Sequence, residues 1–221
     1  IWGAEQEFYS SPKIDDLQCA FTSKEAFLQA ENTGMSKVLA VFDNEEVGSG
    51  TKQGAKSTFL ADVLARIQES LSLTRGESIR QLASSMMLSA DNGHAMHPNH
   101  TDKADPTNAP CLNGGVLIKY NANQKYTTDG IAEALFKKTL RKAEIPYQEY
   151  TNRSDIAGGS TLGNLSNEKV SLNTVDMGAA QLAMHSAYET GGTRDTVSLM
   201  EGIRAFYETR IQMEKDGKYC C

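Results

Sequence analysis

The segment "GGVLIKY", residues 114–120, is a short apolar run that follows a pair of glycines. A run of this length without polar alternation is typical of a strand that is buried on both faces of a sheet. A helical pattern follows over residues 129–143, with Asp129 as a suitable N-cap, and a second strand pattern, "YQEYT", occupies residues 147–151. This order of strand, helix and strand favours an α/β layer fold.

The same alternation continues in both directions along the chain. It predicts an α/β fold with a mostly parallel, or mixed, β-sheet flanked by helices. Further strands are expected at residues 38–42, 84–91 and 170–175, and further helices at residues 15–30, 55–71 and 193–214. The helix at 55–71 is expected because apolar side chains recur at helical spacing, at Phe59, Leu60, Val63, Leu64, Ile67 and Leu71.

Composition excludes several kinds of partner. The 221 residues are enough for one sizeable domain, and the net charge of −6 argues against a nucleic-acid groove or an anionic membrane surface. No apolar run approaches the roughly 18–20 residues that a membrane helix needs. The four cysteines form no CxxC pair, so we expect a reducing, cytoplasmic setting, with a vacuolar or lysosomal-type compartment as the alternative.

Acidic and histidine side chains follow the predicted strands. In "VLAVFDNEEVGSG", residues 38–50, the apolar run ends in the adjacent carboxylates Glu45 and Glu46. Asp91 follows the strand at 84–91, and His185 lies beyond the strand at 170–175. Because functional groups gather at the carboxyl ends of strands in such sheets, we expect these side chains to meet.

Each of these residues also has a structural interpretation. A single acidic residue after a strand is usually a helix cap or a solvated turn, and a single histidine is more often a hydrogen-bonded structural residue than a ligand. As a set, however, Asp, Glu and His supply the oxygen and nitrogen ligands that suit Zn²⁺. Two adjacent glutamates can also divide the work of a metal-dependent hydrolase, since one can coordinate metal while the other takes a proton from water.

Five motifs extend this argument. In chain order they are "SSPKIDDL", "VFDNEEVGS", "SADNGHAMHPNH", "GGVLIKYNANQKYTTD" and "LAMHSAYE", and they span nearly the whole sequence. Together they resemble the aspartyl aminopeptidase and vacuolar aminopeptidase I family of dizinc exopeptidases. The resemblance implies a zinc-exopeptidase-like core, of the phosphorylase/hydrolase-like kind.

The resemblance also implies site residues. Asp15 corresponds to the carboxylate that bridges two zinc ions, Glu45 to the general base and Glu46 to a ligand of one zinc. Asp91 and His185 correspond to ligands of the other zinc. The positions that correspond to substrate contacts are His94, Lys119 and Tyr126. For Lys119 a solvated strand end is the competing interpretation, and for His94 the expected role is to donate to the tetrahedral oxyanion.

The function that the resemblance implies is removal of an acidic or neutral N-terminal residue from peptides, in a parent protein that forms a homo-oligomer. Two departures matter: the family's N-terminal "HxD" motif and its inserted dimerisation domain are absent from this sequence. We therefore expect residues 1–221 to be the C-terminal portion of a single catalytic domain, holding one zinc or fewer tightly rather than two.

Three further expectations remain open. The chain could be a catalytically incomplete fragment, or a non-catalytic module that keeps the family fold. A glycosidase with paired carboxylates and no metal is a third class, which loss of activity in a chelator would separate from the peptidase. A sheet that lacks strands would expose an apolar edge, so we also expect self-association in isolation.

Overall fold

The computed structural model describes residues 1–214 and 217–221. Its main sheet is mixed and has the strand order β2-β6-β4-β5. β2 is parallel to β6 and β4 is parallel to β5, while β4 and β6 run antiparallel. The bounds of these strands are Met86–Ala90 for β2, Val116–Tyr120 for β4, Tyr147–Thr151 for β5 and Asn173–Gly178 for β6. The predicted fold class, a mixed sheet flanked by helices, is confirmed.

A second sheet, which the sequence patterns did not predict, has the order β1-β8-β7-β3. Its strands are short, and only β3 and β7 are parallel neighbours. Their bounds are Phe8–Ser11 for β1, Gly93–His94 for β3, Ala180–Leu182 for β7 and Glu189–Gly192 for β8. This sheet joins the start of the chain to residues 180–192, so it brings together segments that are far apart in sequence.

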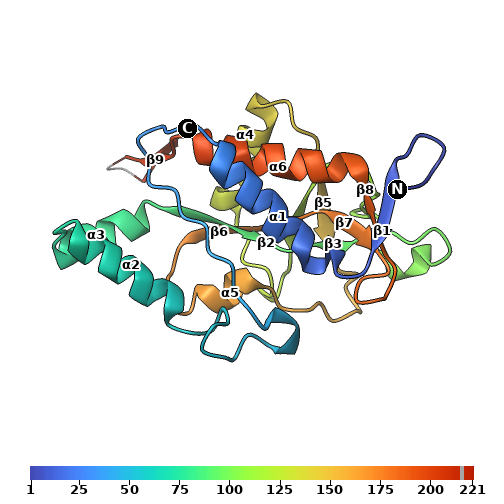
Figure 1. Cartoon of the computed structure of the whole chain (residues 1–221), viewed down its shortest axis with the longest axis horizontal. Helices are drawn as coiled ribbons and strands as arrows, with labels where there is room; N and C mark the ends of the chain where they lie inside the picture. The colour runs from blue at the N-terminus through green and yellow to red at the C-terminus, as the bar shows by residue number, and fades with distance from the viewer. Residues whose placement is uncertain (215–216) are drawn as a thin grey trace.

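Helices α1 (Ile14–Gln29) and α6 (Thr193–Glu208) lie side by side along one face of the sheets, and α4 (Gly130–Lys142) packs against α6 (Figure 1). The short helix α5 (Leu162–Ser166) contacts β2 and β6 from the opposite side in this view. The core between α4, α6 and the main sheet contains Val116, Ile118, Phe136, Leu140 and Leu199. Asp129 caps α4 as predicted, because its carboxylate accepts hydrogen bonds from the amides of Ile131 and Ala132.

The strand predicted at residues 38–42 is wrong. This segment has no strand assignment, and Val38 and Val41 are 47% and 61% exposed. An apolar run becomes a strand only where a neighbouring strand can complete its hydrogen bonds, and the described residues provide no such neighbour beside it.

The last six residues of the predicted terminal helix are also wrong, whereas its first sixteen residues are helical. α6 ends at Glu208, six residues before the predicted end, and the strands β9 (Gln212–Met213) and β10 (Tyr219–Cys220) pair beyond it. The predicted helix at residues 55–71 exists as α2 (Phe59–Ser70), followed by α3 (Arg75–Ala83), and most of the apolar side chains that indicated it are exposed. Figure 1 shows both helices at one end of the molecule, away from α1 and α6. Among the described residues, no helix is both long and apolar enough to cross a bilayer.

Candidate metal centre

Asp15 is the residue around which the candidate site is arranged. It lies where β1 leads into α1, in a non-helical conformation with φ −83° and ψ 110°. Its side chain is almost fully buried, and its Oδ1 atom has no hydrogen-bond partner among the described residues. A buried carboxylate oxygen without a partner is costly, and a bound cation is one of the few groups that can satisfy it.

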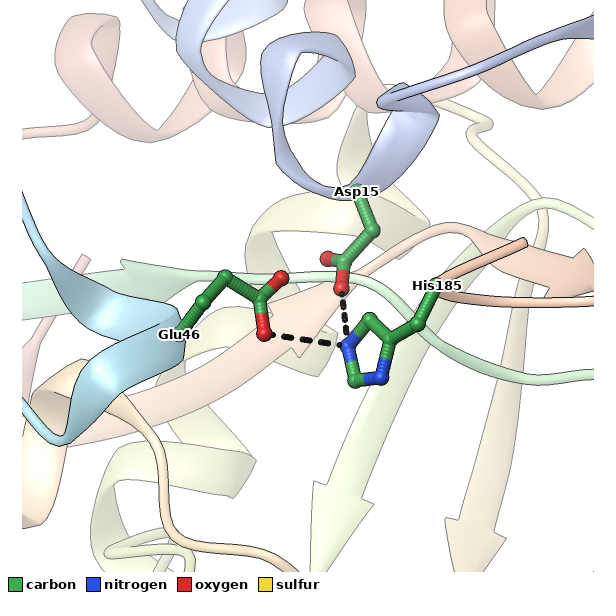
Figure 2. A group of neighbouring side chains, drawn as sticks. All are labelled: Asp15, Glu46 and His185. Carbon is green, nitrogen blue, oxygen red and sulfur yellow. Dashed lines mark hydrogen bonds and ion pairs between the residues drawn. The ribbon is translucent and has the colours of Figure 1, made fainter. Parts of the chain in front are cut away.

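His185 and Glu46 meet Asp15 from two other parts of the chain (Figure 2). The Nε2 atom of His185 lies 3.2 Å from Asp15 Oδ2 and 3.1 Å from Glu46 Oε2. Glu46 belongs to the 3₁₀ turn η1 (Glu45–Val47), which follows Asn44 in a left-handed conformation. The ligand atoms of these three residues all lie within 4.8 Å of one another, a spacing at which they could hold one metal ion.

A second group shares Asp15. The carboxylates of Asp15, Asp16 and Asp91 also lie within 4.8 Å of one another. Asp91 follows β2 as predicted, and its Oδ2 atom accepts a hydrogen bond of 2.8 Å from Lys119 Nζ. The structure therefore contains two overlapping groups of potential ligands with one common carboxylate, the arrangement expected for a bridging residue.

Electrostatics support a cation at this point. Burial, together with the neighbouring carboxylates of Asp91 and Glu46, raises the pKa of Asp15 to about 7. Burial and Asp91 likewise raise the pKa of Asp16 well above its ordinary value. Several carboxylates this close repel each other in their charged forms, and a divalent cation removes that repulsion.

All predicted site residues lie around this centre. Glu45 is half-buried, and its pKa is raised by burial and then by Asp91 and Glu46. The pKa of His94, at the end of β3, is lowered, first by partial desolvation and then by the charges of His185 and Lys119. Lys119 Nζ lies 5.1 Å from the centre of the Tyr126 ring. His97 and His100 pack against each other and belong to neither ligand group.

Two details differ from expectation. The interpretation of Lys119 as a solvated strand end is wrong, because its side chain is 1% exposed and is bonded to Asp91 and to the Asn92 carbonyl. Burial on its own lowers the pKa of this ammonium, but the carboxylates of Asp91 and Asp176 outweigh burial and leave the pKa raised. In addition, the geometry groups His185 with Glu46 rather than with Asp91. Asp16, which the sequence argument did not single out, completes the second group; its signal was the paired aspartate in "KIDD".

Oxygen and nitrogen ligands from Asp, Glu and His fit Zn²⁺. A carboxylate–histidine cluster beyond the ends of strands in a mixed α/β fold is an arrangement that metal-dependent hydrolases use. A family model described as aminopeptidase I zinc metalloprotease (M18) matches residues 1–207. The chain therefore belongs to the M18 family.

Individual relatives agree with this assignment. The chain is 45% identical over 207 residues to a probable M18 family aminopeptidase 2 from Clostridium novyi, covering 94% of this chain and 48% of the relative. It is 38% identical over 215 residues to a probable aspartyl aminopeptidase from Ricinus communis, covering 94% and 44%. The S. cerevesiae mApe1 dodecamer superposes with a TM-score of 0.81 at 28% identity, covering 94% and 47%. The chain thus spans about half the length of the relatives it matches.

Proposed function

We propose that this chain carries the zinc centre of an aminopeptidase, an enzyme that removes the N-terminal residue of peptides. The observation that supports the proposal most directly is the meeting of two ligand groups at Asp15, whose buried Oδ1 atom has no partner among the described residues. The zinc ligands that we propose are Asp15, Glu46, Asp91 and His185, with Asp15 shared. Asp16 is within reach of the second group as well.

Zinc bound here would polarise the scissile carbonyl and make the attacking water more acidic. In our proposal, the chain's own groups then handle the protons. Glu45 takes a proton from the water and passes it to the leaving amine. Glu45 directly precedes Glu46 in η1, and burial together with the charges of Asp91 and Glu46 raises its pKa, while it is a member of neither ligand group.

The substrate contacts are proposals of the same kind. His94, at the end of β3, is the candidate donor to the oxyanion, and Tyr126 is the candidate aromatic wall. Lys119 is bonded to Asp91, so a substrate carboxylate would have to compete with that pair. For this reason we propose peptides with a free N-terminus as the substrate class. Whether the first residue is acidic or neutral is tested by assaying both kinds of peptide.

The experiment that tests this proposal compares two histidines. Zinc per chain is measured after dialysis against a weak chelator, for the wild type, for His185→Ala and for His97→Ala. We expect the wild type to retain zinc, His185→Ala to lose most of it, and His97→Ala to match the wild type, since His97 lies outside both ligand groups. Equal zinc in all three proteins, or none in the wild type, would contradict the proposed centre.

Hydrolysis of short peptides with aspartate or leucine as the first residue is measured on the same samples. Zinc retention with turnover supports a working aminopeptidase site in this chain. Zinc retention without turnover indicates a catalytically incomplete part of a longer enzyme.

The four cysteines are free thiols, which accords with the expected reducing, cytoplasmic setting, and that setting remains a prediction.

A further inference from the structure

Glu189 is a buried carboxylate that belongs to neither ligand group. It is the first residue of β8, and it is 2% exposed. Its Oε2 atom accepts a hydrogen bond of 2.9 Å from the backbone amide of Asp15, and its Oε1 atom accepts one of 2.7 Å from the backbone amide of His185. Both oxygens are thus used on the main chain of the two residues that meet at the candidate metal centre.

Strand register explains why one side chain reaches both amides. β1 and β8 are antiparallel, and Ser11 lies opposite Glu189. From this pair the chain runs four residues forward to Asp15 and four residues back to His185, so both residues lie beyond the same end of the strand pair. The Glu189 carboxylate lies between the two diverging segments and joins them.

The segment that contains His185 needs such support. His185 has a φ of 67°, in the left-handed region that residues other than glycine seldom adopt. Hydrogen bonds from backbone amides to a carboxylate are stronger than those between neutral groups, and a buried amide without a partner is costly. Two such bonds from one rigidly buried side chain therefore fix the main chain of His185 relative to that of Asp15.

We infer that Glu189 is a positioning residue, which holds Asp15 and His185 at the separation at which their side chains share one divalent cation. The inference rests on the metal centre proposed above. Glu189 supplies no ligand atom, so its effect on zinc is exerted through the backbones of Asp15 and His185. Partners of this kind, once removed, typically weaken metal binding by about 10- to 100-fold.

The test uses the 221-residue chain with Glu189→Gln. Glutamine has nearly the same shape, but it keeps one acceptor oxygen and turns an NH₂ group towards the second amide. Asp195→Asn is the matched control, because Asp195 is 1% exposed and also accepts two backbone amides, those of Asn113 and Gly115, outside both ligand groups. Zinc affinity is measured by competition with a chromophoric chelator, and the melting temperature is measured on metal-free protein.

We expect both variants to melt at similar temperatures, whereas only Glu189→Gln binds zinc about 10- to 100-fold more weakly. The visible absorption of bound Co²⁺ should change in Glu189→Gln and stay unchanged in Asp195→Asn, since it reports ligand geometry rather than global stability. Equal zinc affinities for Glu189→Gln and the wild type, or an equal loss in the control, would overturn the positioning role.

A second measurement covers the case in which Glu189→Gln does not fold. Amide hydrogen exchange in the wild type should be slow at Asp15 and His185, although His185 lies on an exposed segment. Rapid exchange at both amides would overturn the inference without any variant. If the wild-type chain binds no zinc, the proposed metal centre itself is overturned. In that case hydrogen exchange still decides separately whether Glu189 joins the segments of Asp15 and His185.

Discussion

Glu45 and Glu46 are neighbours in sequence, but they occupy different positions in the site. Glu46 Oε2 contacts His185 Nε2, whereas Glu45 belongs to neither ligand group. The difference follows from the 3₁₀ turn, in which consecutive side chains point in directions about a third of a turn apart. One residue can therefore face the ligand cluster while the next faces the space beside it.

This division of roles predicts different outcomes for the two glutamates. Glu45→Gln should keep the zinc content of the wild type and lower turnover by about 10²- to 10⁴-fold, because an amide cannot accept the proton of the attacking water. Glu46→Gln should instead lower the zinc content. Both quantities are obtained from one preparation, by elemental analysis and by peptide hydrolysis. Retained turnover in Glu45→Gln would remove Glu45 from the role of base.

At the scale of elements, α6 has a buried acid in its first turn. Asp195 lies in the first turn of α6 and accepts hydrogen bonds from the amides of Asn113 and Gly115, which precede β4. It thereby joins α6 to the segment that leads into β4, one of the two inner strands of the main sheet. Burial raises the pKa of this carboxyl to about 6 from the ordinary 3.8, although the two amides act in the opposite direction.

The raised pKa of Asp195 determines the direction in which the free energy of unfolding changes with pH. The folded state binds the proton of Asp195 more tightly than the unfolded state, so this contribution is complete below about pH 3.8 and is lost as the pH rises through about 6. Urea unfolding of metal-free wild type and Asp195→Asn, at pH 7.5 and at pH 4.5, measures it. We expect the wild type to gain about 2 kcal/mol relative to the variant on going to the lower pH.

Comparison of the two proteins isolates Asp195, because every other titrating group is common to both. The asparagine side chain of the variant does not titrate, so its own contribution to the free energy of unfolding is the same at both pH values. A difference between the proteins that does not change with pH would mean that Asp195 stays ionised throughout this range, and that its burial is compensated by the two amides.

The helices and strands also show which elements can be predicted from local sequence patterns. β4, β5 and α4 were predicted nearly to the residue, because a continuous apolar run, a strand pattern and an N-cap are local signals. The second sheet was missed because strands such as β8, "ETGG", have little local strand preference and are stabilised by partners distant in sequence. The segment at 38–42 failed for the converse reason, since its pattern was apolar but no neighbour completes it among the described residues.

The residues of the candidate site also fall into two groups, those that sequence motifs identified and those that were recognised only in the structure. Asp15, Glu46, Asp91 and His185 could be identified because they lie in motifs that resemble a family. Asp16 and Glu189 lie in two of the same motifs, "SSPKIDDL" and "LAMHSAYE", but the sequence argument did not single them out, because a helix-start acid and a strand residue also have ordinary structural interpretations. Their positions depend on the pairing of β1 with β8, which joins residues more than 170 positions apart. Sequence motifs thus indicated the ligands that we propose, while the residue that we infer to position them emerged only from the three-dimensional arrangement.

At the scale of the whole molecule, one exposed apolar surface is the α2 stripe, which we define as Phe59, Val63 and Ile67. These residues recur every four positions along α2, so they share one helix face, and all three are exposed. Val41 and Ile79, on the segments before and after α2, are exposed too. Exposed apolar side chains that share one helix face are candidates for contact with another molecule.

We therefore expect the chain to self-associate through the α2 stripe. Full burial of an exposed apolar side chain contributes about 1.5–3 kcal/mol, and the three residues of the stripe, which are 38–49% exposed, would each contribute a part of that in a dimer. Ile67→Lys should weaken association, because a charged group cannot enter an apolar contact without a partner. Ala65→Lys is the matched control, since it adds the same charge on the same helix but off the stripe. Sedimentation velocity over a range of concentrations measures both. If the two variants associate as strongly as the wild type, contacts between copies lie elsewhere, and the edge strand β2 becomes the next surface to alter.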